Sequence, residues 1–138
     1  EYTQGLLLNV ADSVHDFTGN QLSNAPELSV NASIDYRTPW GRGEVRAHIG
    51  AAYTGQQWFT PYNGDFSYQN IGQAGHTLTN ARVEYQWSAG RYALSLWGSN
   101  LGDKEYQVYA TNLSEGFGFN YTIKGAPKTY GLGLRGKF

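Results

Sequence analysis

Apolar and polar side chains alternate along much of this 138-residue chain, and that alternation restricts the folds open to it. The pattern runs through residues 27–37, 44–54, 80–87, 91–99 and 129–138. In none of these runs does a charged residue fall on the apolar parity. A period of two places successive side chains on opposite faces of a strand. The sequence therefore predicts an all-β protein of antiparallel strands, each with one apolar and one polar face.

Short and long connections alternate between these strands. Residues 38–43 and 88–90 are tight turns built from Gly, Pro and Ser, whereas residues 11–25, 59–76 and 111–126 are long and rich in Asn, Gly and aromatics. Short turns at one end and long loops at the other are typical of a transmembrane β-barrel. A soluble β-sandwich produces the same alternation of side chains and stays open as an alternative.

Aromatic residues favour the membrane over the sandwich. They gather where the apolar parity meets the two tight turns, as in an interfacial girdle: Tyr36 and Trp40 at one turn, and Tyr85, Trp87 and Tyr92 at the other. Strand length agrees, because about ten residues tilted by about 40° span about 25 Å, the height of the apolar band.

Composition excludes several other classes of protein. The chain has no cysteine, which rules out disulfide scaffolds and thiol chemistry. Its net charge of −1 gives no electrostatic reason to expect a nucleic-acid partner. We find no acid/base pair, nucleophile motif, metal-ligand spacing or phosphate-binding loop, so the sequence predicts no enzyme, no metal and no cofactor.

Two stretches near the end of the chain carry a family resemblance. They are Asn-Leu-Gly-Asp-Lys-Glu-Tyr at residues 100–106 and Pro-Lys-Thr-Tyr-Gly at residues 127–131. With the strands around them, the chain from about Gly19 onward resembles the C-terminal barrel segment of TonB-dependent outer-membrane receptors. The resemblance implies that residues 1–138 are the last five to six strands of a 22-stranded transmembrane β-barrel, without its plug domain and earlier strands. It also implies one long strand over residues 91–110 and a loop over residues 111–126.

The resemblance implies transport across the bacterial outer membrane. Such a receptor takes up a scarce ligand, most often a ferric siderophore, otherwise cobalamin or an oligosaccharide, through a plugged barrel. The implied partners are outer-membrane lipid, the remainder of the receptor, the TonB complex through the missing N-terminal part, and the barrel-assembly machinery, for which Phe138 is the expected signal. A passive or structural outer-membrane barrel and a soluble β-sandwich binding module are the alternatives.

Two sets of side chains are candidates for function. Aromatic rings in the long loops are the expected ligand surface, because they offer large contact area with a polar handle: Trp58, Phe59, Tyr62, Phe66, Tyr68, Phe117, Phe119 and Tyr121. The alternative is that these rings pack the loops against each other. Charged side chains on the polar parity are expected to face the barrel lumen: Arg46, His48, Arg82, Glu84 and Arg135. They contact the plug or a solute path, or form solvated cross-strand pairs.

Glycines interrupt the polar parity of the last strand. Gly131 and Gly133 fall on the side that is expected to face the lumen. A glycine inside a strand often marks a place where another group approaches the backbone closely. The sequence therefore predicts that the plug or a neighbouring side chain lies against this strand.

Overall fold

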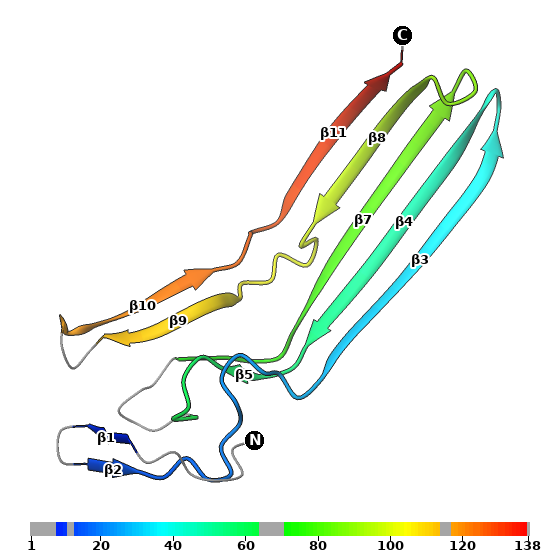
Figure 1. The fold of residues 1–138 in the computed structure, drawn as a ribbon. Helices are drawn as coiled ribbons and strands as arrows, with labels where there is room; N and C mark the ends of the chain where they lie inside the picture. Colours follow the sequence, from blue (N-terminus) through cyan, green and yellow to red (C-terminus); the bar gives the residue numbers. More distant parts are fainter. Residues whose placement is uncertain (1–7, 11–12, 64–70, 114–116, 138) are drawn as a thin grey trace. The chain divides into compact units, whose positions relative to one another are not determined.

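The computed structural model describes residues 8–10, 13–63, 71–113 and 117–137, and these residues form eleven β-strands (Figure 1). The chain divides into two compact units. The sheet unit comprises Ser29–Tyr53, Thr77–Glu105 and Ala126–Phe138, and the loop unit comprises Glu1–Leu28, Thr54–His76 and Tyr106–Gly125. In the described part of the chain, no helix has the length and apolar character needed to cross a membrane.

Five long strands make up the sheet unit. They are β3 (Ser29–Trp40), β4 (Gly43–Thr54), β7 (His76–Trp87), β8 (Tyr92–Ser99) and β11 (Thr129–Gly136). Their order across the sheet is β11-β8-β7-β4-β3, and β8 pairs antiparallel with both β7 and β11 (Figure 1). The alternating runs of the sequence thus become neighbouring strands of one sheet.

The turn between β3 and β4 is shorter than the sequence indicates. Strand β3 continues through Pro39 to Trp40, and only Gly41 and Arg42 separate it from β4. Proline cannot donate a ladder hydrogen bond, and Pro39 stands next to the last residue of β3, beside the turn. Gly41 adopts a φ of +58°, the left-handed conformation that tight hairpin turns require.

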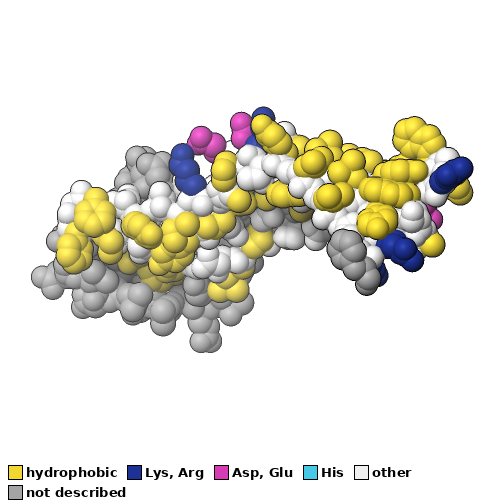
Figure 2. Space-filling model, turned by 90° about the horizontal axis from the view of Figure 1, so that it is seen from above, with side chains coloured by type: hydrophobic (Ala, Val, Ile, Leu, Met, Phe, Trp, Pro, Cys, Tyr) yellow, Lys and Arg dark blue, Asp and Glu magenta, His cyan; other side chains and the backbone are white. Residues whose placement is uncertain are grey.

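The apolar face of the sheet lies open. Val30, Ile49, Val83 and Leu132, one from each of four strands, are 48%, 53%, 48% and 72% exposed. Figure 2 shows hydrophobic side chains gathered over the surface at the right of the view. In a β-sandwich these side chains would be buried against a second sheet about 10 Å away. Their exposure contradicts the sandwich alternative and agrees with a face made for a hydrocarbon environment.

The described part of the loop unit contains three two-stranded antiparallel sheets. They pair β1 (Leu8–Val10) with β2 (Ser13–His15), β5 (Gln57–Trp58) with β6 (Gly72–Gln73), and β9 (Gln107–Leu113) with β10 (Phe119–Lys124). Phe59, Ile71 and Ala110 form a small buried core, and Tyr62 packs against it. Just after β2, Thr18 donates backbone and side-chain hydrogen bonds to Asp16, which lower the pKa of that carboxyl.

The prediction of one long strand over residues 91–110 is wrong. Strand β8 ends at Ser99, and β9 begins only at Gln107. Between them Asn100 and Asp103 adopt φ values of +49° and +50°, which no strand accommodates. The loop predicted over residues 111–126 is likewise replaced in part by β10, whose own alternation of Phe119, Tyr121 and Ile123 with polar residues is the signal that could have indicated it.

Candidate functional site

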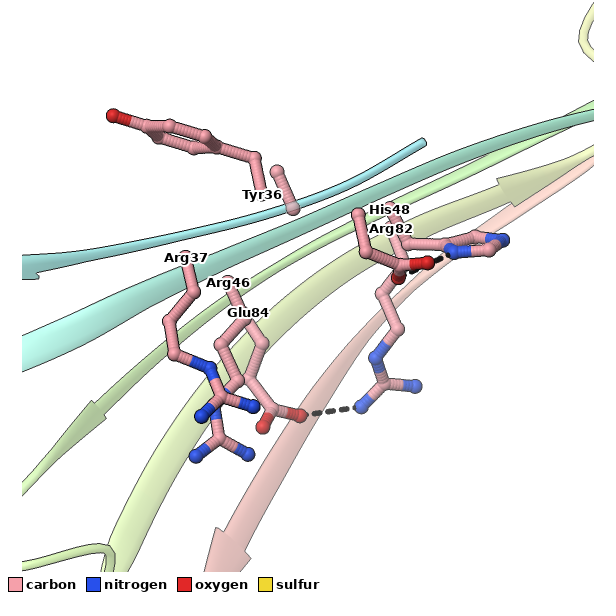
Figure 3. A pocket seen from close by; sticks show the side chains of 8 residues that line it. Tyr36, Arg37, Arg46, His48, Arg82 and Glu84 are labelled. Carbon is pink, nitrogen blue, oxygen red and sulfur yellow. Dashed lines mark hydrogen bonds and ion pairs between the residues drawn. The ribbon is translucent and has the colours of Figure 1, made fainter. Parts of the chain in front are cut away.

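Charged side chains share the polar face of the sheet. Arg37, Arg46, Arg82 and Glu84 extend to the same side of the strands, whereas Tyr36 points away from it (Figure 3). These charged groups, with Asp35 and His48, line an open hollow of about 450 Å³ over β3, β4 and β7. The structure thus brings together four of the five residues that the sequence predicts to face a lumen, and the fifth, Arg135, joins them through an ion pair. That the face lines a lumen stays a prediction.

Glu84 is the centre of one group of charges. Its side chain is only 12% exposed, and its carboxylate accepts a hydrogen bond from Arg82 Nη2 at 2.6 Å and another from Gln86. Arg135 Nη2 lies 3.6 Å from the other carboxylate oxygen. Strand β8 separates β7 from β11, so the Glu84–Arg135 pair crosses an intervening strand.

Small side chains on β8 permit that crossing. Ser95 lies opposite Glu84 in the register of β7 and β8, and Ala93 lies opposite Arg135 in the register of β8 and β11. Both are buried although they stand on the polar face. The long side chains of Glu84 and Arg135 meet across these short ones, which explains the burial. Sequence analysis missed Ala93 and Ser95 because their role depends on the strand order.

Two further groups of ionisable side chains are in contact on this face. Glu44 accepts a hydrogen bond from Arg46 and lies 3.6 Å from Arg37 Nε. Asp35 Oδ1 lies 2.8 Å from His48 Nδ1. Two of these contacts connect β3 to β4. Such cross-strand pairs stabilise a sheet by about 0.2–1 kcal/mol each, and here they also fix the side chains around the hollow.

A tryptophan covers the glycine of the last strand. Trp97 lies between Arg82 on β7 and Gly131 on β11 in the sheet register. A Cβ added at Gly131 would lie 2.7 Å from the Trp97 indole, and one added at Gly133 would lie 2.7 Å from Ser95 Oγ. The close approach predicted for these glycines is confirmed, and neighbouring side chains of the same sheet make it.

The described aromatic residues of the loop over residues 59–76, and Trp58 just before it, make packing contacts. Phe59 is buried in the core of the loop unit, and Tyr62 meets the buried ring of Phe17 edge to face at a centroid distance of 5.0 Å. Trp58 lies against Gly72, where an added Cβ would approach its ring to 2.7 Å. These contacts favour the packing alternative for this loop. Phe66 and Tyr68 lie outside the described residues.

The β9–β10 hairpin presents an exposed aromatic face. Phe119, Tyr121 and Ile123 alternate along β10, and the register places Tyr109 of β9 directly opposite Ile123. We call these four residues the aromatic face; all of them are exposed. Ala110 stands on the opposite face of the hairpin and is buried in the core. Phe117, 73% exposed, lies beside Phe119 with ring centroids 6.2 Å apart.

Comparison with known proteins identifies the fold and the family. The family model described as TonB dependent receptor-like, beta-barrel, matches residues 2–101. Among solved structures, the ferric yersiniabactin uptake receptor FyuA from Yersinia pestis is similar, with a TM-score of 0.75 and 16% sequence identity; the match covers 93% of this chain and 19% of that chain. The chain therefore spans about a fifth of that receptor and forms only part of a barrel. The family match over residues 2–101 shows that the chain belongs to the TonB-dependent receptor β-barrel family, and the likeness to the solved receptor agrees with its fold.

Proposed function

We propose that residues 1–138 are the C-terminal part of an outer-membrane receptor that takes up a scarce ligand with energy from the TonB complex. The observation that carries this proposal is the family match over residues 2–101. The exposed apolar face supports a location in a bilayer, since a barrel presents such a band to lipid. The polar face would then line the lumen, where Arg46, His48, Arg82, Glu84 and Arg135 meet water and the plug.

A row of aromatic rings supports the same location. The row lies at the end of the sheet that holds the tight turns. Trp40 meets Tyr85 edge to face at a centroid distance of 6.4 Å. Trp87 stacks on Tyr85 at 5.7 Å and on Tyr92 at 5.8 Å. Tyr85 Oη also donates a hydrogen bond to the Trp40 carbonyl. Amphipathic rings concentrate at membrane–water interfaces. We assign this row to the periplasmic girdle of the bacterial outer membrane. Phe138, the proposed assembly signal, lies outside the described residues.

A ferric siderophore is the ligand class that we propose. The similar solved structure is a ferric yersiniabactin uptake receptor, and at 16% identity that likeness extends only to the fold. Phe117, Phe119 and Tyr121 add support, because exposed aromatic rings offer a partly apolar ligand a large contact area. Cobalamin and an oligosaccharide are the other ligand classes, and the test below includes cobalamin as a probe.

Uptake by cells that carry or lack the intact gene tests the proposal. The probes are ⁵⁵Fe complexes of a catecholate and a hydroxamate siderophore and radiolabelled cobalamin, each measured with and without functional TonB. We expect uptake of one ferric complex to disappear on loss of either the gene or TonB. Uptake that persists without TonB would indicate a passive barrel, and loss of cobalamin uptake alone would change the ligand class.

Variants of the hairpin locate the binding surface. Phe119→Ala and Tyr121→Ala each truncate a ring of the aromatic face, and we expect at least about fivefold weaker binding of the transported complex. Thr122→Ala is the matched control, because Thr122 belongs to the same strand but faces the other way in the register. Equal effects at all three positions would exclude the aromatic face as the ligand surface.

A further inference from the structure

Asn100, the first residue of the stretch Asn-Leu-Gly-Asp-Lys-Glu-Tyr, uses both ends of its side-chain amide. Its Nδ2 donates hydrogen bonds to the carbonyl oxygens of Lys104 at 2.9 Å and Ala126 at 3.1 Å. Its Oδ1 accepts a hydrogen bond from the backbone N–H of Lys104 at 2.9 Å. The residue is only 3% exposed, so these partners replace water for both amide protons and for the oxygen.

The backbone at Asn100 is held as well as its side chain. Asn80 Oδ1, on β7, accepts hydrogen bonds from Asn100 N at 3.1 Å and from Ser99 Oγ at 2.9 Å. Leu101 N donates to the Thr79 carbonyl at 2.9 Å. Asn100 itself has a φ of +49°, a conformation that Asn tolerates better than most residues. The end of β8 is therefore fixed to β7 while the chain turns away from the strand direction.

The contacts of Asn100 connect two segments that are distant in sequence. Residues 100–106 leave β8 toward β9, and residues 125–128 return from β10 to β11. The bond to Ala126 links the two, and Asp103 adds a second link: its carboxylate accepts a hydrogen bond from Lys128 N at 3.4 Å and lies 3.9 Å from Lys128 Nζ. The segment that leaves β8 and the segment that returns to β11 are thus joined around the buried side-chain amide of Asn100.

We propose that Asn100 is a positioning residue whose side-chain amide holds the outgoing segment, residues 100–105, and the returning segment, residues 126–128, together at the end of the sheet. The amide itself is required. Two carbonyl oxygens need donors and one N–H needs an acceptor, within the reach of a side chain of this length. Aspartate has the same shape but, when ionised, accepts only. This positioning role does not depend on the proposed function.

The Asn100→Asp variant separates this role from simple filling of space. At neutral pH its carboxylate would face the carbonyl oxygens of Lys104 and Ala126. The hydrogen bonds that Asn100 Nδ2 donates to these two oxygens are then lost, and negatively charged oxygens repel one another instead. In acid the protonated carboxyl regains one O–H donor and can restore one bond. Burial and the two carbonyls disfavour the ionised form of this introduced carboxyl. Asp103, Lys104 and Lys128 are present in every variant, so any difference between variants in the pH dependence of hydrogen exchange comes from position 100.

Hydrogen exchange measured by mass spectrometry on the intact receptor in detergent tests the proposal. At about pH 7.5 we expect N100A and N100D to exchange about tenfold faster in peptides covering 99–106 and 125–130, as loss of buried hydrogen bonds requires. At about pH 5, after correction for intrinsic rates, N100D recovers protection over 125–130 and N100A does not. Asn31→Asp, at an exposed position in β3, is the matched control and leaves both peptides unchanged.

Three results would overturn the proposal: wild-type protection in N100D at about pH 7.5, loss of protection confined to 99–106, or equal pH profiles for N100D and N100A. If N100A does not fold, a second measurement tests the proposal. N100D is refolded at the two pH values, and its folded fraction is measured from the change in gel mobility on heating. More folded protein in acid supports the role of the amide, and equal fractions refute it. Since exchange and refolding need no ligand, their failure is distinguishable from failure of the uptake proposal.

Discussion

The ring of Tyr106 lies across Gly125, where two chain segments meet in the loop unit. A Cβ added at Gly125 would lie 2.0 Å from Tyr106 Cζ, so only glycine leaves room for the ring. The backbone N–H of Gly125 donates to the Tyr106 carbonyl at 2.8 Å, and the ring stacks on buried His76 at a centroid distance of 4.8 Å. Tyr106 is the last residue of the stretch that Asn100 begins, so both ends of that stretch hold the returning chain.

Gly125→Ala should therefore destabilise the receptor by about 1–3 kcal/mol, the usual cost of forcing extra volume into a packed site. Thermal unfolding of the intact receptor in detergent measures this cost. Gly102→Ala is the control, because the nearest atom to its added Cβ is Thr79 Oγ1 at 3.9 Å, and we expect a cost below about 0.5 kcal/mol. In a Tyr106→Ala background the cost of Gly125→Ala should largely disappear; strictly additive costs would contradict this account.

Alternation alone predicts which face a residue occupies but not which residue stands opposite it. Trp97 interrupts the polar parity of its strand, and Gly131 lies on the polar parity of another; both are visible in the sequence. That the indole lies against this glycine depends on the register between β8 and β11. Asn100 is a similar case, since its partner Ala126 is 26 residues away in sequence. The family resemblance marked the stretch, and only the structure supplied its physical role.

Strands with one open face were the most predictable elements. The runs at 27–37, 44–54 and 80–87 correspond to β3, β4 and β7, because solvent on one side and apolar surroundings on the other impose a strict period of two. The break between β8 and β9 was not predictable from this pattern. Positive φ at Asn100 and Asp103 is stabilised by long-range hydrogen bonds, which leave no periodic signal.

Neighbouring residues in the middle of β3 test the assignment of the two faces. Ile34 belongs to the apolar face and Ser33 to the polar face, one position apart in the same strand. Ile34→Lys should cost about 2–4 kcal/mol of folding free energy in a bilayer, whereas Ser33→Lys should cost little, because its charge stays in water. The measurement is the folded fraction of the intact receptor in lipid vesicles across a urea series. Equal costs at the two positions would contradict the assignment.

At the scale of the whole molecule, the described sheet ends at β3 on one side and β11 on the other. Backbone N–H and C=O groups cannot stay unpaired in a bilayer, so a membrane-spanning sheet of this kind needs further strands. The family and the similar receptor agree with this requirement, because the chain covers only 19% of that receptor's length. We propose that earlier strands of the same protein close the barrel against both edges.

Residues 1–138 expressed alone should therefore associate through these edges instead of folding to a stable monomer. Light scattering after detergent removal, combined with chemical unfolding, measures this. The intact receptor in detergent is the control and should remain monodisperse with a cooperative transition. A monodisperse isolated chain that unfolds cooperatively without detergent would contradict the membrane assignment, because its apolar face would then have found cover elsewhere.

The bridge between Glu84 and Arg135 passes over Ala93 and Ser95 of an intervening strand. Strands β7 and β11 share no backbone hydrogen bonds, yet this ion pair couples them, because the short side chains of Ala93 and Ser95 leave room for it. A bulky side chain introduced at either position would stand between Glu84 and Arg135 and keep their charges apart. Which side chains β8 accepts at positions 93 and 95 thus depends on Glu84 of β7 and Arg135 of β11.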